Sequence, residues 1–202
     1  MSFRKEKKFR VTVNDFHNFQ DQLHRLGMET LFEPRLITSV YFDTANLNMF
    51  NDSEEGLLPR KKVRIRWYNN SKAFSLENKT SSVEGRFKLA TKLGKSISEN
   101  ELLTRNRMDA QYGLIQPTLK VSYKRSYFMY NEMRLTFDKD ICYTNFKSAD
   151  RRKFYDPERV IEIKISANCA DDFVETLIPF PTARFSKYSR GILFSTGGLS
   201  EN

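Results

Sequence analysis

Arginine, lysine and glutamate occupy alternate positions in several strand-like segments of this sequence. Arg64 and Arg66 alternate with Val, Ile and Trp, and Glu162 and Lys164 alternate with isoleucines. Because successive side chains of a β-strand point to opposite faces, each segment has one charged face and one apolar face. A single strand of this kind is ordinary in a sheet with one solvated face, so only recurrence gives the pattern meaning.

The pattern does recur. Other predicted strands carry charged faces formed by Glu6, Lys8 and Arg10; by Glu77 and Lys79; by Arg86 and Lys88; by Arg125; and by Arg134 and Asp138. A guanidinium grips two phosphate oxygens at once, and carboxylates are the ligands that hard divalent cations prefer. If the strands close into a barrel with these faces inward, the lumen is a cationic tunnel, and a bound polyanion offsets its internal repulsion.

Alternation and turn residues predict an antiparallel α+β fold made of one domain over residues 1–202. Asn14 is the predicted N-cap of the first helix, helices are expected on the apolar outer face, and residues 185–194 are a final ordered segment of no assigned type. The predicted strands are 7–13, 38–43, 61–68, 74–80, 84–88, 118–130, 133–143 and 159–166; the predicted helices are 15–26, 98–105 and 171–178; residues 46–56 are predicted as turns.

Composition indicates an anionic partner. The formal net charge is +9, the sequence pI is about 9.5, and aromatic residues make up 13%. Cys142 and Cys169 have no metal-ligand or redox spacing, the N-terminal residues lack an apolar signal region, and no apolar run approaches the roughly 20 residues of a membrane helix. These features predict a cytoplasmic protein without a membrane segment of its own, which leaves room for a membrane or regulatory partner protein.

Eight short motifs, taken in chain order, resemble the catalytic domain of the vacuolar transporter chaperone (VTC) family. That family belongs to the triphosphate tunnel metalloenzymes, together with the CYTH phosphatases. The motifs are Glu6-Lys7-Lys8, Tyr41-Phe42-Asp43, Arg64-Ile65-Arg66-Trp67-Tyr68, Leu76-Glu77-Asn78-Lys79, Val121-Ser122-Tyr123-Lys124-Arg125, Arg134-Leu135-Thr136-Phe137-Asp138, Ile161-Glu162-Ile163-Lys164 and Ser186-Lys187-Tyr188.

The resemblance implies an eight-stranded antiparallel β-barrel with flanking helices, and a polyphosphate polymerase that transfers the γ-phosphate of ATP with Mn²⁺ or Mg²⁺. It implies catalytic phosphate contacts from Lys8, Arg64, Arg66, Lys79, Arg125, Arg134 and Lys187. Further phosphate contacts are Lys88, Lys164 and Arg190, with Lys92 as the alternative to Lys88. Glu162 is the first metal-ligand candidate, followed by Glu6, Glu77 and Asp138.

Other functions stay open at this point. The same lumen could hydrolyse tripolyphosphate or a nucleoside triphosphate, or could bind polyphosphate without turnover. A single-stranded nucleic-acid binder would also be basic and aromatic, but carboxylates interleaved with the cations disfavour it. The Glu-x-Glu-x-Lys start of the CYTH phosphatases is incomplete here, because Glu6 is its only carboxylate, and this favours the polymerase branch.

Overall fold

The computed structural model describes residues 4–71, 73–94, 98–146, 151–166 and 171–199, so Cys169 lies outside the described residues. The strands are β1 (Arg4–Val11), β2 (Glu29–Asp43), β3 (Arg60–Tyr68), β4 (Ser75–Ser82), β5 (Gly85–Lys92), β6 (Arg107–Asp109), β7 (Gly113–Tyr130), β8 (Met133–Asn145), β9 (Lys153–Tyr155) and β10 (Arg159–Ser166). The helices are α1 (Val13–Arg25), α2 (Asn48–Glu55), α3 (Glu99–Thr104), α4 (Asp171–Leu177) and α5 (Lys187–Ser195).

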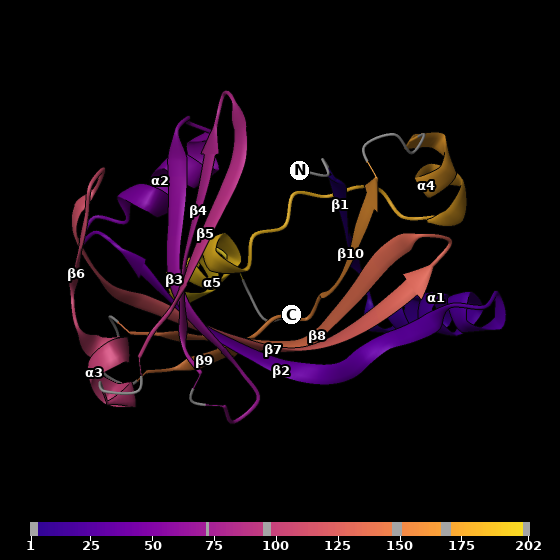
Figure 1. Cartoon of the computed structure of the whole chain (residues 1–202), viewed down its shortest axis with the longest axis horizontal. Coiled ribbons are helices and arrows are strands. Elements are labelled where there is room, and N and C mark those ends of the chain that lie inside the picture. The colour runs from indigo at the N-terminus through magenta and orange to yellow at the C-terminus, as the bar shows by residue number, and fades with distance from the viewer. Residues whose placement is uncertain (1–3, 72, 95–97, 147–150, 167–170, 200–202) are drawn as a thin grey trace.

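The eight main strands form one antiparallel sheet in the order β1-β10-β8-β7-β2-β3-β4-β5, while β6 pairs with β7 and β9 pairs with β8. The sheet curls until β1 and β10 face β3, β4 and β5 across a floor of β8, β7 and β2 (Figure 1). Within the described ranges no ladder joins β1 to β5. The predicted antiparallel fold with flanking helices is confirmed, and the barrel has the form of a half-barrel.

The hairpin of β7 and β8 sets the register of the floor. Asn131 and Glu132 at its turn have φ of 44° and 59°, the positive values that a tight two-residue hairpin turn requires. The resulting pairing brings Arg125 opposite Asp138. On the other side of β8, Thr136 lies opposite Glu162 of β10. Two segments far apart in the sequence thus present their charged residues to the same concave face.

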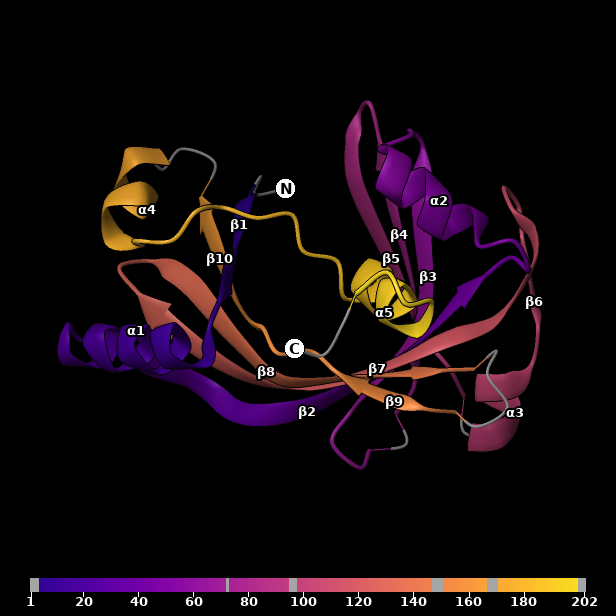
Figure 2. The same ribbon diagram turned by 180° about the vertical axis from the view of Figure 1, so that it is seen from behind.

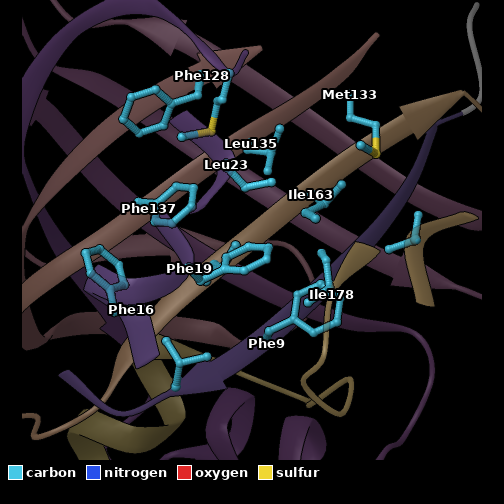
Figure 3. Close-up of a cluster of buried hydrophobic side chains, with 14 of the residues drawn as sticks. Phe9, Phe16, Phe19, Leu23, Phe128, Met133, Leu135, Phe137, Ile163 and Ile178 are labelled. Atoms are coloured by element: carbon cyan, nitrogen blue, oxygen red, sulfur yellow. The ribbon is translucent and has the colours of Figure 1, made fainter. Parts of the chain in front are cut away.

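The convex face of β1, β8 and β10 is covered by helices, as the sequence predicts. Phe16, Phe19 and Leu23 of α1 pack against Phe137 and Ile163 of the sheet in a buried apolar cluster (Figure 3). The N-cap of α1 is Thr12 rather than the predicted Asn14, because the Thr12 hydroxyl accepts the backbone N–H of Asp15 at 3.1 Å.

Residues 46–56 contain helix α2, so the prediction of turns alone is wrong there. The segment has no side-chain cap of its own, and Leu47 at the N-cap position is left-handed. The buried carboxylate of Asp43 supplies the missing acceptors, because it takes the backbone N–H groups of Met49 and Phe50 at 2.9 Å each. A partner from β2 therefore stabilises a helix that the local sequence does not cap.

Helix α5 lies inside the half-barrel, between its two walls (Figure 2). It packs on an apolar part of the concave face, where Leu119 and Tyr143 contact Ile192 and other residues of the same buried cluster. A Cβ at Gly191 would overlap the side chains of Leu119 and Tyr143, so a larger residue there would force one of these buried side chains to shift. The sequence assigns no type to the ordered segment 185–194; most of it is helix α5, which lies on the inner face because that face is charged over only part of its length.

Candidate functional site

A cavity of about 430 Å³ lies between the walls of the half-barrel. Its lining contains ten Lys and Arg residues against three Glu residues, an excess of 10 − 3 = +7 charges. The cations are Lys8, Lys62, Arg64, Arg66, Lys79, Arg86, Lys88, Arg125, Lys164 and Lys187, and the carboxylates are Glu6, Glu77 and Glu162. Strands β1, β3, β4, β5, β7 and β10 and the start of α5 contribute these side chains.

Arg64 and Arg66 are held in place by one carboxylate. Glu77 on β4 is 5% exposed; it accepts Arg64 Nε at 2.8 Å and Lys88 Nζ at 2.7 Å. Arg66 Nη1 lies 3.8 Å from the same group. Burial raises the pKa of Glu77, but Arg64 and Arg66 outweigh burial and lower this pKa to about 2. Glu77 therefore stays ionised and orients two arginines and a lysine toward the cavity.

A second cluster forms where β7, β8 and α5 meet. Asp138 is 1% exposed and accepts Arg125 Nε at 2.5 Å and Nη2 at 2.7 Å. Lys187 Nζ donates to the same carboxylate at 2.5 Å. Burial raises the pKa of Asp138, but Arg125 and Lys187 outweigh burial and lower this pKa to about 2. The register of the β7–β8 hairpin and the position of α5 together create this fixed pair of cations.

The remaining carboxylates belong to a cross-strand network on β1 and β10. Lys8 pairs with Glu162 and Glu6 with Lys164 in the ladder. Lys164 Nζ lies 3.2 Å from Glu162 and 3.7 Å from Glu6, so one ammonium joins both carboxylates. Burial raises the pKa of Glu6, but Lys8, Lys79 and Lys164 lower it to about 2. Glu6 and Glu162 therefore face the cavity as two neighbouring acceptors.

The four predicted metal ligands divide into two kinds. Glu77 and Asp138 are each held by short bonds from arginine and lysine donors. Glu6 and Glu162 share Lys164 at the wall of the cavity, and Lys8 lies 3.1 Å from Glu6 and Arg125 3.8 Å from Glu162. No group of three or more His, Cys, Asp or Glu side chains suited to a metal occurs in the described part of the chain. Two carboxylates fit a Mg²⁺ or Mn²⁺ ion that takes its other ligands from phosphate oxygens and water.

Most of the predicted phosphate contacts lie together in the cavity, and three do not. Lys88 lines the cavity and Lys92 does not. Arg190 is absent from the lining; it donates to Asp156 at 2.7 and 2.8 Å. Arg134 is also outside the lining, and its guanidinium lies 5.7 Å from the Tyr127 ring centroid. Its buried Nε has no hydrogen-bond partner among the described residues.

Sequence reasoning missed several residues that line the cavity, notably Tyr41, Lys62 and Ser186. Arg64 Nη1 donates to the Tyr41 hydroxyl at 2.7 Å, and Lys62 Nζ donates to the Ser186 hydroxyl at 2.8 Å. Burial lowers the pKa of Lys62 to about 8. Its alternation with Arg64 was a signal that could have found Lys62, whereas nothing local placed Ser186 at the cavity.

The N-terminus of α5 adds a further electropositive element. Ser186 is its N-cap, accepts the backbone N–H of Ser189 at 3.3 Å, and lines the cavity together with Lys187. The positive end of a helix dipole favours anions. The arrangement as a whole can bind a multiply charged anion with planar guanidinium donors from β3 and β7 and ammonium groups from other walls.

The VTC domain model matches residues 3–196, and the chain therefore belongs to the VTC domain family. Its fold is that of the triphosphate tunnel proteins. A putative adenylate cyclase from Bacillus halodurans is similar with a TM-score of 0.60 and 15% identity, over 92% of this chain and 94% of that one. A putative adenylyl cyclase from Hippeastrum, described as having a dominant triphosphatase activity, is similar with a TM-score of 0.56 and 16% identity, over 98% of both chains.

A putative adenylate cyclase from Vibrio parahaemolyticus gives a TM-score of 0.53 at 18% identity, over 95% of this chain and 98% of that one. No curated protein sequence matches this chain. In the described residues, no helix is both long enough and apolar enough to cross a membrane.

Proposed function

We propose that this protein is a metal-dependent phosphotransferase that binds ATP and polyphosphate in the cavity and extends the polyphosphate chain. The observation that carries the proposal is the excess of seven positive charges in the cavity lining, where buried carboxylates already orient the guanidinium groups of Arg64 and Arg125. A condensed phosphate chain is the anion that matches several planar donors in succession. Membership of the VTC domain family supports this substrate class.

The proposed reaction forms a P–O bond between the terminal oxygen of a polyphosphate chain and the γ-phosphorus of ATP. The bond from that phosphorus to the bridging oxygen breaks, and ADP leaves with the electron pair. Arg64, Arg66 and Arg125 neutralise the charge on the transferring group, and the fixed positions of their side chains favour an in-line approach. Glu6 and Glu162 are the residues proposed to hold Mg²⁺ or Mn²⁺, which would polarise the phosphoryl oxygens.

Incubation of the purified protein with ATP and Mn²⁺ or Mg²⁺, with polyphosphate and free phosphate measured together, tests this function. Growth of polyphosphate supports the polymerase. Free phosphate without chain growth would identify a triphosphatase instead, and binding of tripolyphosphate without either product would leave a binding module. Preference for single-stranded nucleic acid over tripolyphosphate would contradict the proposal.

Arg66→Ala should lower the rate about 10² to 10³-fold, the loss typical of one missing donor to the transition state. Arg66 is 7% exposed and donates to Ser39 and Tyr123 at 3.1 and 3.3 Å. Arg105→Ala, which removes the same charge from a side chain that is 68% exposed, is the matched control and should keep full activity. A folded Arg66→Ala protein with the activity of the control would refute the assigned role.

The cytoplasmic location and a membrane or regulatory partner stay predictions.

A further inference from the structure

Strand β5 forms an open edge of the sheet. It pairs with β4 along its whole length, and no register shift interrupts the ladder. It is terminal in the sheet order, and no strand of the described residues lies beyond it. The other terminal strand, β1, is partly covered, because Ala183 donates its backbone N–H to the Lys8 carbonyl at 2.8 Å and Thr182 forms a bridge with Phe9. The edge that stays open over its whole length is therefore that of β5.

The register of the β4–β5 ladder shows which backbone groups face the open edge. Hydrogen-bonded and non-hydrogen-bonded pairs alternate along an antiparallel ladder. Leu93, directly after β5, donates its N–H to the Phe74 carbonyl at 2.9 Å, so the odd-numbered residues of β5 exchange backbone hydrogen bonds with β4. The backbone N–H and C=O groups of the even-numbered residues therefore point away from β4. These residues are Arg86, Lys88, Ala90 and Lys92.

The side chains of β5 also suit an added strand. Phe87 and Leu89 alternate with the cations of the strand and are 55% and 64% exposed. Proteins protect a long edge strand with proline, a β-bulge or charged residues, and β5 has only the charged residues. A regular edge with exposed apolar side chains is the surface that strand addition uses, because backbone hydrogen bonds supply affinity and alternate side chains supply specificity.

The charges of β5 disfavour a second copy of the same strand and favour an acidic one. With a two-fold axis at Lys88, Leu89 or Ala90, antiparallel self-pairing sets Lys88 opposite Lys88, Arg86 opposite Lys92, or Lys88 opposite Lys92, respectively. Like charges directly opposite each other destabilise a strand pair, and opposite charges stabilise it. Glu77 already holds Lys88 at 2.7 Å, whereas no carboxylate in the described part of the chain pairs with Arg86 or Lys92.

We propose that β5 is a docking edge for an extended segment of another protein, in which acidic and apolar side chains alternate. The segment adds to the sheet as a further strand, and its backbone bonds to the outward N–H and C=O groups of β5. Its carboxylates lie opposite Arg86 and Lys92, and its apolar side chains cover Phe87 and Leu89. The inference does not rest on the proposed function, because it depends on the backbone of the sheet edge and not on transfer of phosphate.

The test uses the full chain and a capped peptide of alternating Glu and Val that has the length of β5. Hydrogen exchange followed by NMR should show the amides of Arg86, Lys88, Ala90 and Lys92 slowed about tenfold or more on addition of the peptide, because each amide then forms a ladder hydrogen bond. A peptide of alternating Lys and Val should bind at least about tenfold more weakly, since its charges lie opposite cations.

Ala90→Pro removes one outward N–H and leaves the hydrogen bonds between β4 and β5 in place, so it should weaken binding of the Glu-Val peptide about tenfold. Ala90→Ser keeps the N–H and is the matched control, which should bind as the wild type does. A Glu-Val peptide that is N-methylated at every second residue, on the side that faces β5, tests the same hydrogen bonds without a change in the protein and should not bind.

Three outcomes would overturn the docking edge. The first is that the Glu-Val peptide does not bind, or binds without slowing exchange at the four amides. The second is that tripolyphosphate displaces the peptide while those amides stay in fast exchange, which would show that the carboxylates enter the cavity instead. The third is a dimer in sedimentation whose β5 amides are already protected, which would make a second copy the occupant.

Discussion

Replacing Asp138 tests how much the clustered cations of the cavity lower the unfolding free energy, and how much of that loss a bound anion restores. Asp138 is 1% exposed and is the counter-ion of both Arg125 and Lys187. In Asp138→Asn the two cations keep their positions and lose their compensating charge. Uncompensated charges in a buried site destabilise the folded state, and the same charges attract an added anion more strongly.

The size of the effect follows from the pKa and from the geometry. The pKa of Asp138 is lowered from 3.8 to about 2, and at 1.36 kcal/mol per pKa unit this shift corresponds to about 2 kcal/mol at neutral pH. Breaking a buried ion pair by removing one partner costs about 3–5 kcal/mol. We therefore expect Asp138→Asn to lose about 2–5 kcal/mol of unfolding free energy, or roughly 5–15 °C in Tm.

The assay is denaturant and thermal unfolding of both proteins with and without tripolyphosphate. The ligand should stabilise Asp138→Asn more than the wild type, because its phosphates replace the lost negative charge. Asp140→Asn is the matched control on the same strand: Asp140 lies 3.3 Å from Lys124, both side chains are largely exposed, and the change should cost less than about 1 kcal/mol. Equal stability of the two variants, or equal stabilisation of Asp138→Asn and wild type by tripolyphosphate, would refute the reasoning.

Three further outcomes are expected. Glu6, Glu77 and Asp138 have pKa values lowered to about 2 from 4.5, 4.5 and 3.8, so the stability that they contribute is present above pH 5 and is lost as the pH falls toward 2; unfolding titrations that stay flat across that window would contradict these ion pairs. Lys62→Met should raise the unfolding free energy at pH 7 by about 1–2 kcal/mol and weaken polyphosphate binding, because burial lowers the pKa of Lys62 to about 8 and disfavours the charged ammonium group that the folded protein carries at pH 7. The stability gain should disappear as the pH rises from 8 to 10.5, because Lys62 is then neutral in the folded protein. A gain that persists above this range would show another cause. Gly191→Ala should destabilise the protein by about 1–3 kcal/mol despite the better helix propensity of alanine, since its Cβ would approach Tyr143 Cδ1 to 2.6 Å; the control Ser195→Ala on α5 should change Tm little, and an unchanged Tm in Gly191→Ala would mean that α5 is packed less tightly than described.

The local pattern of the sequence determined the strands and the face on which each charge lies. Alternation along β3 and β10 placed Arg64, Arg66, Glu162 and Lys164 on the charged face of their strands, since the period of two is a local property of an extended chain. Asn131 and Glu132 predicted the β7–β8 hairpin for the same reason, because turn preferences depend on adjacent residues. Helix α2 was missed because its capping acceptor, Asp43, lies on another element.

Only the tertiary structure decided which charged residues share the cavity. Arg134 and Arg190 have the same residue type as Arg64, yet neither lines the central cavity, because sheet curvature and the packing of α5 determine where each side chain points. Lys187 pairs with Asp138, 49 positions away in the sequence, and Lys62 pairs with Ser186, 124 positions away. Contacts of this range depend on how the whole sheet closes, and no local pattern of residues encodes them.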